Sequence, residues 1–72
     1  MLNCEKLEAM KWAALRDDWP RASDLYLDIQ EEAITVQDKF EAGALAPYFR
    51  LRDAAKVRYL VNNLLAEPAD PG

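Results

Sequence analysis

Few side chains in this 72-residue chain could act as acids, bases or nucleophiles near neutral pH. Histidine, the commonest general base in that range, is absent, and Cys4 is the only cysteine. Apart from the tyrosines, the hydroxyl nucleophiles are Ser23 and Thr35, and neither lies in an acyl-transfer motif or has a histidine to activate it. We therefore expect a protein that is not an enzyme.

Metal and cofactor sites are poorly supplied as well. One thiol without histidine cannot build a zinc site of the usual Cys/His type within one chain, so we interpret Cys4 as a small apolar residue of the core. The adjacent acids Asp17-Asp18 and Glu31-Glu32 point about 100° apart on a helix, which is typical of a solvated face. A chain with two glycines has no glycine-rich phosphate loop. We expect no metal and no cofactor.

The elements that must position these residues are helices, and one pattern is clearer than the others. Apolar residues recur at alternating steps of four and three between Ala22 and Phe40, which is the seam of a coiled-coil-type helix. This spacing predicts one helix over residues 20–42, which we take as the scaffold of the fold. The seam consists of Ala22, Tyr26, Ile29, Ala33, Val36 and Phe40, and the acids Asp24, Asp28, Glu31 and Asp38 fall on the opposite side.

A helix over residues 3–17 is predicted before it, with Asn3 as the N-cap. Asp18 is then a suitable cap for the second helix. The first helix has apolar residues on two sides, so either it buries a broad face in a small bundle or its tryptophans belong to an interface. One stripe is Cys4, Leu7, Met10 and Ala14, and the other is Trp12, Leu15 and Trp19.

A third helix is predicted over residues 47–66. Gly43 is expected to end the second helix in the left-handed conformation, and Pro47 suits the first turn of the next. Helices joined by such short connectors lie antiparallel. The predicted fold class is therefore all-α: three antiparallel helices form a small bundle, or a helical hairpin on which the third helix docks. Residues 1–66 would form one domain and residues 67–72 a disordered tail.

The charge of −4 is unevenly distributed. Residues 1–46 carry ten acids against five bases, whereas residues 47–66 carry four bases against one acid. An acidic chain repels phosphate, so we do not expect nucleic acid as a partner. Because the third helix is basic, we expect it to pack beside the acidic second helix, in the same chain or in a partner chain. The alternative is a DNA-associated transcriptional regulator that uses the third helix.

Localisation follows from two features. No apolar run approaches the ~20 residues of a membrane span, and Glu5, Lys6 and Glu8 interrupt any signal-peptide-like segment at the start. A single cysteine without an export signal is typical of a reducing compartment. We expect a cytoplasmic protein with no membrane association.

These observations favour a small, acidic, non-catalytic module that binds a larger protein and modulates it as an inhibitor, adaptor or antagonist. A core this small is marginal, so we also expect a homodimer. Leu27 and Ile34 lie seven residues apart, on the side of the predicted helix opposite its seam, and begin to form a contact strip. The acids of that helix form the predicted acidic steering face, which would attract a basic partner: Asp24, Asp28, Glu31 and Asp38. The candidate contact residues are Trp12, Trp19, Leu27, Ile34, Tyr48, Phe49, Arg52 and Tyr59.

Overall fold

The computed structural model describes residues 2–66, and within this range the chain is all-helical, without a strand. The all-α prediction is confirmed, but the predicted number of helices is wrong, because two of the three predicted helices are interrupted. The predicted tail at residues 67–72 lies outside the described residues. The helices are α1 (Cys4–Leu15), α2 (Trp19–Glu32), α3 (Val36–Gly43), α4 (Ala46–Leu51) and α5 (Ala54–Ala66).

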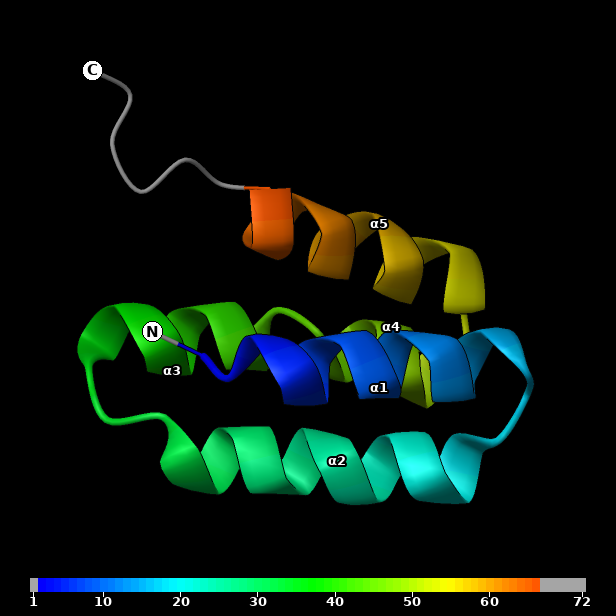
Figure 1. Cartoon of the computed structure of the whole chain (residues 1–72), viewed down its shortest axis with the longest axis horizontal. Helices are drawn as coiled ribbons and strands as arrows, with labels where there is room; N and C mark the ends of the chain where they lie inside the picture. Colours follow the sequence, from blue (N-terminus) through cyan, green and yellow to red (C-terminus); the bar gives the residue numbers. More distant parts are fainter. Residues whose placement is uncertain (1, 67–72) are drawn as a thin grey trace.

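Helix α1 lies at the centre of the molecule. Figure 1 shows it between α2 and α5, both antiparallel to it, with α3 and α4 behind. Leu7, Met10, Ala13 and Ala14 are all buried, so α1 buries a broad face, as in one of the two predicted alternatives. The scaffold role that we predicted for residues 20–42 therefore belongs to α1, whose apolar residues face neighbours on two sides.

The predicted helix over residues 20–42 breaks after Glu32. Ala33 takes an extended conformation with ψ of 118°, and Thr35 becomes the N-cap of α3. The Thr35 hydroxyl accepts a hydrogen bond of 3.0 Å from the backbone N–H of Asp38, which satisfies one of the free donors of the new helix. The apolar seam predicted for this helix consequently ends at Ala33.

The predicted helix over residues 47–66 breaks as well. Arg52 takes the left-handed conformation with φ of 52°, and the N–H of Asp53 donates to the Tyr48 carbonyl over 2.9 Å. This is the Schellman arrangement that ends many helices. The Asp53 carboxylate then accepts from the N–H of Lys56 over 3.2 Å and caps α5.

The connection between α3 and α4 differs from the expected one. Gly43 is the last residue of α3 and is not left-handed, and Ala44 after it keeps a helical conformation with φ of −64°. The chain turns into α4 through Leu45, which is fully buried. Burial of this leucine anchors the turn, so no left-handed glycine is needed there.

The other predicted helix caps are confirmed. The Asn3 side chain accepts from the N–H of Lys6 over 3.1 Å, and the Asp18 carboxylate accepts from the N–H of Arg21 over 3.4 Å. Between α1 and α2, Asp17 has a φ of 63°, and the N–H of Asp18 donates to the Ala13 carbonyl. A second Schellman turn therefore reverses the chain and sets α2 antiparallel to α1.

Replacing Arg52 with glycine is expected to raise the free energy of unfolding by about 1 kcal/mol, because a side chain in the left-handed region carries a steric cost that glycine does not. Arg52→Ala is the matched control: it removes the guanidinium but keeps the strained Cβ, so we expect little change. Urea unfolding followed by circular dichroism measures both. Equal stabilities for the two variants would contradict the strain at this turn.

Candidate functional site

Two of the predicted contact residues belong to an aromatic cluster that packs against the core. Trp19 is only 7% exposed, and its ring meets the Phe49 ring edge-on at 5.6 Å between centroids. Phe49 also stacks on Tyr26 at 4.8 Å. The indole N–H of Trp19 donates to the Asp17 carboxylate over 2.7 Å. The Trp19–Phe49–Tyr26 cluster attaches α4 to α2, so we remove Trp19 and Phe49 from the candidate surface.

Tyr48 and Arg52 lie at opposite ends of the same short helix turn. Tyr48 is half-buried and packs against the core, while Arg52 is exposed at the end of α4. The Tyr48 carbonyl is the acceptor of the Schellman turn at Arg52. Both positions therefore have a structural role in ending α4, and Arg52 alone presents its side chain to a partner.

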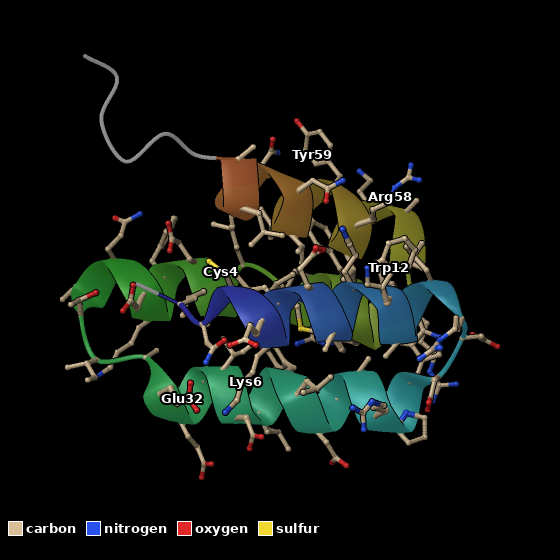
Figure 2. All side chains as sticks on the ribbon, in the orientation of Figure 1. Cys4, Lys6, Trp12, Glu32, Arg58 and Tyr59 are labelled. Carbon is tan, nitrogen blue, oxygen red and sulfur yellow. The ribbon has the colours of Figure 1, made fainter. Side chains whose placement is uncertain are left out.

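Trp12 and Tyr59 are exposed, at 55% and 67%. Figure 2 shows Trp12 on the α5 side of α1, with Arg58 above it on α5. Beside Trp12, the Lys11 ammonium lies 5.0 Å from the centre of the indole ring and donates to the Asn62 amide oxygen over 3.2 Å. Trp12 therefore covers a polar link between α1 and α5, which gives it a packing role as well as an accessible edge.

The polar link also contains Glu8, whose carboxylate lies 2.9 Å from the Lys11 ammonium, one helical turn away. Lys11 is the most buried lysine among the described residues. Its charge is compensated by the carboxylate, the amide and the indole face, as burial of an ammonium requires. The interaction ties α1 to α5 and leaves Lys11 unavailable for a partner.

The exposed acids of α2 gather around Leu27. Asp24, Asp28 and Glu31 line a shallow surface depression with Leu27, which is 55% exposed. We call these three acids and this leucine the α2 acidic strip. Asp38, the fourth acid of the predicted acidic steering face, does not belong to the strip, because it lies on α3 and is only 5% exposed. The structure therefore removes Asp38 from the predicted face.

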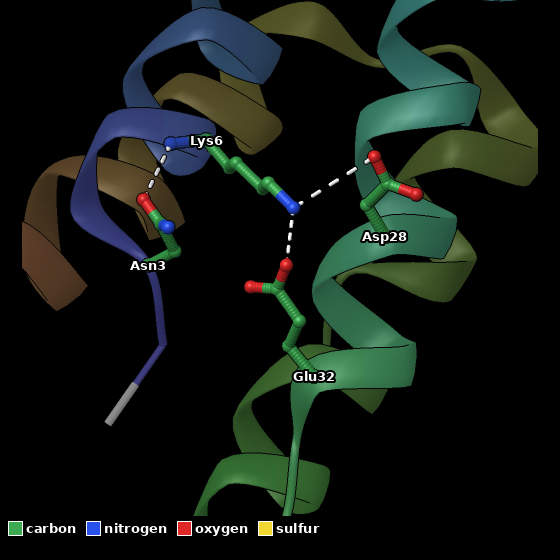
Figure 3. Close-up of polar contacts among 4 residues, drawn as sticks. All are labelled: Asn3, Lys6, Asp28 and Glu32. Carbon is green, nitrogen blue, oxygen red and sulfur yellow. Dashed lines mark hydrogen bonds and ion pairs between the residues drawn. The ribbon is translucent and has the colours of Figure 1, made fainter.

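One lysine fastens this side of α2 to α1. The Lys6 ammonium forms an ion pair with the Glu32 carboxylate and lies 3.8 Å from Asp28 (Figure 3). The hydrogen bond to Glu32 raises the pKa of Lys6 above its usual value, and the negative charges of Asp28 and Glu31 act in the same direction. Part of the negative charge of α2 is thus compensated within the chain.

The stability of the fold is expected to fall in alkaline solution. Burial raises the pKa of the Tyr26 phenol, and the bond to Glu32 raises that of Lys6, so both folded-state pKa values lie above the unfolded ones. Their contribution is complete below the unfolded values near pH 10 and is lost as the pH rises through the folded ones. The free energy of unfolding, measured with urea at pH 7, 9, 10 and 11, should stay constant to about pH 9 and decrease above it. Tyr26→Phe should show a smaller loss than the parent, and an equal loss would contradict the role of the phenol.

Helix α3 is inverted relative to an ordinary surface helix. Asp38 and Ala42, four residues apart, face the interior at 5% and 1% exposure. Val36 and Phe40, also four residues apart, face outward at 86% and 73%, and Ile34 before the cap is 83% exposed. We call Ile34, Val36 and Phe40 the α3 outer patch. Two of these residues were predicted to lie in the core, and the structure corrects both.

The signal for the α3 outer patch was present in the sequence. Thr35 followed by Asp38 has the spacing of a capping box, in which a hydroxyl residue precedes an acidic one by three positions. This spacing favours a new helix start at Val36 and ends the seven-residue register on which the Leu27–Ile34 strip depended. Leu27 lies on α2 and Ile34 in the connector, so they do not form that strip, although both are exposed.

Only the first part of the predicted basic third helix, α4, contacts α2, through the Phe49 ring, and its longer part, α5, does not pack beside α2. Helix α5 packs against α1, on the side away from α2 (Figure 1). The bases of this region are therefore not paired with the α2 acidic strip, which corrects the first of the two packing arrangements that we expected. The exposed bases are Arg50, Arg52, Lys56 and Arg58.

The remaining chemical groups are few. Cys4, expected in the core, is exposed and has a free thiol in the first turn of α1 (Figure 2). Residues 2–66 contain no group of three His, Cys, Asp or Glu side chains placed to hold a metal ion. In the same range, no helix is both long and apolar enough to cross a membrane.

Comparison with known proteins gave no match: no protein-family model, no curated protein and no solved structure is significantly similar to this chain.

Proposed function

We propose that this protein is a non-catalytic interaction module that binds a larger protein and modulates it, as an inhibitor, adaptor or antagonist. The observation that carries the proposal is the inversion of α3. Large apolar side chains face solvent at Val36 and Phe40 of α3 and at Ile34 just before it, while Asp38 of α3 is buried. Grouped apolar side chains on a small protein are typical of interaction sites.

Free energy favours covering these side chains. Burying one large apolar side chain releases about 1.5–3 kcal/mol, and the fold itself leaves all three members of the α3 outer patch in water. The rest of α3 is not free to rotate and hide them, because the Thr35 cap and the burial of Ala42 fix its orientation. A partner surface can recover this free energy when it covers the patch.

A photo-cross-linking residue placed at position 40 tests the proposal in the source cell. We expect one dominant cross-linked protein, captured from position 40 and identified by mass spectrometry. The matched control is position 51, because Leu51 is equally exposed at 74% but lies on α4. Identical products from the two positions, or none from position 40, would overturn the assignment of the patch.

The alternative function, a DNA-associated regulator, is supported by one observation. Lys56 and Arg58 are exposed on α5, which packs on the side of α1 away from α2, and Arg52 is exposed at the end of α4. Duplex DNA binding titrated with salt separates the two functions, since phosphate contacts give a steep salt dependence. If the protein is an interaction module, neither the parent nor Lys56→Glu should bind duplex DNA detectably at physiological salt.

We propose a reducing compartment, the cytoplasm, as the place of action. The supporting observation is the accessible thiol of Cys4, which an oxidising compartment would tend to pair with another thiol. Fractionation of the source cell, followed by detection of the protein, tests this. Recovery only from an oxidising compartment would contradict it.

A further inference from the structure

We infer that the occupant of the α3 outer patch is a basic amphipathic helix of the partner protein. This inference rests on the proposed function and adds the chemistry of the partner. It combines three features of the α2–α3 half of the molecule: its apolar ridge, its charge and the internal backbone hydrogen bonds of α3.

The apolar ridge selects a helix over an extended strand. The backbone around Phe40 is bonded within its own helix, since the Lys39 N–H donates to the Thr35 carbonyl and the Ala44 N–H to the Phe40 carbonyl, both over 3.0 Å. An extended segment would find no backbone partners there, whereas a helix satisfies its own backbone. Val36 and Phe40, one turn apart, form a ridge that fits between the side-chain rows of a second helix.

The charge around the ridge selects a basic partner. Residues 19–43 carry six acids and two bases. Glu31 lies three residues before Ile34, within about 11 Å along the chain. The last turn of α2 has no base, so its acids add to the negative end of the helix dipole. Lys6 compensates Asp28 and Glu32, which leaves Glu31 for lysine or arginine of the partner.

The size of the patch favours a short helix over a second copy of this chain. The patch consists of three exposed side chains, against about 20–30 residues a side in a standard interface, so charge must supply part of the affinity. A second copy does not offer the required face. Its basic helix α5 buries Val57 and Val61 against its own core, and its outer face carries bases and the single large apolar side chain of Tyr59 rather than an apolar ridge.

The experiment is a nuclear magnetic resonance titration of the whole chain with a synthetic 14-residue helical peptide (about four turns) that has leucine on one face and lysine on the other. We expect amide shifts centred on Ile34, Val36 and Phe40, and none with the matched peptide that carries glutamate in place of lysine. The double variant Val36→Ser/Phe40→Ser should bind at least about tenfold more weakly, a loss of about 1.4 kcal/mol. Leu51→Ser, an equally exposed apolar position, should bind like the parent.

Charge is tested separately with Glu31→Lys, which should weaken binding several-fold and reduce its salt dependence. Shifts centred on Trp12 or Tyr59, equal binding of the acidic peptide, or no binding of the basic peptide would each overturn the inference. Shifts that depend on protein concentration without peptide, together with a dimer by light scattering, would assign the patch to a second copy. A positive cross-link from position 40 beside a failed titration would keep the proposed function and reject only this partner chemistry.

Discussion

Replacing Ile29 with alanine is expected to lower the free energy of unfolding by about 2–5 kcal/mol, which is most of the stability of a domain this small. Ile29 is fully buried in the core and lies in α2, the helix that packs against α1, three residues after Tyr26. The loss has two sources: the apolar atoms that are no longer removed from water, and the cavity that a close-packed core cannot close. Urea unfolding followed by circular dichroism gives the value.

Phe40→Ala is the matched control for this prediction. Phe40→Ala removes a larger side chain than Ile29→Ala does, but Phe40 is 73% exposed. We therefore expect the free energy of unfolding to change by no more than about 0.5 kcal/mol. The sequence pattern had placed both residues on one buried seam. Equal losses in the two variants would contradict the break between α2 and α3 and restore the continuous helix.

The all-α class followed from periodicity, because a 3.6-residue repeat of apolar residues needs no tertiary information. The same repeat misplaced Val36 and Phe40. The apolar spacing continues across the connector between α2 and α3, so the repeat alone does not show that the helix breaks there. Only the cap at Thr35 indicates that a new helix begins. At both Asn3 and Thr35, a short polar side chain accepts a hydrogen bond from a backbone N–H three residues later. The cap at Asn3 was predicted from this local pattern, and the cap at Thr35 could have been predicted in the same way.

The central position of α1 could not be predicted from its own pattern. Apolar residues on two sides of a helix are compatible with a broad buried face or with an interface, and tertiary packing decides between them. The packing of α1 against both α2 and α5 shows that α1 has neighbours on two sides. The break at Arg52 was also hidden, because arginine rarely takes the left-handed conformation and carries no sequence signal for it.

The candidate site changed more than the fold did. Aromatic and arginine residues are enriched in interfaces, but the same aromatic residues also fill small cores, so residue type alone cannot separate the two. Trp19 proved to be a core residue and Phe49 a half-buried one packed against the core, whereas Trp12 and Tyr59 are exposed. Exposure has to be known before an aromatic residue can be assigned to a contact surface.

Phe49→Ala is expected to lower the free energy of unfolding by about 3 kcal/mol, although Phe49 is only half-buried. Its ring meets two others, edge-on against Trp19 and stacked on Tyr26, and such pairs add about 0.5–1.5 kcal/mol beyond burial. The α4 helix has six residues and cannot hold its conformation alone, so loss of this ring should release it from α2.

Two variants make the Phe49 prediction specific. Phe49→Leu keeps most of the apolar volume but loses the ring pairs. Its free energy of unfolding should therefore lie between that of the parent and that of Phe49→Ala. Arg50→Ala changes the neighbouring exposed residue and should stay within about 0.5 kcal/mol. Urea unfolding gives the three values, and near-ultraviolet circular dichroism reports whether the aromatic cluster persists. If Phe49→Ala were as stable as Arg50→Ala, Phe49 would not hold α4 in place, and it would return to the candidate contact surface.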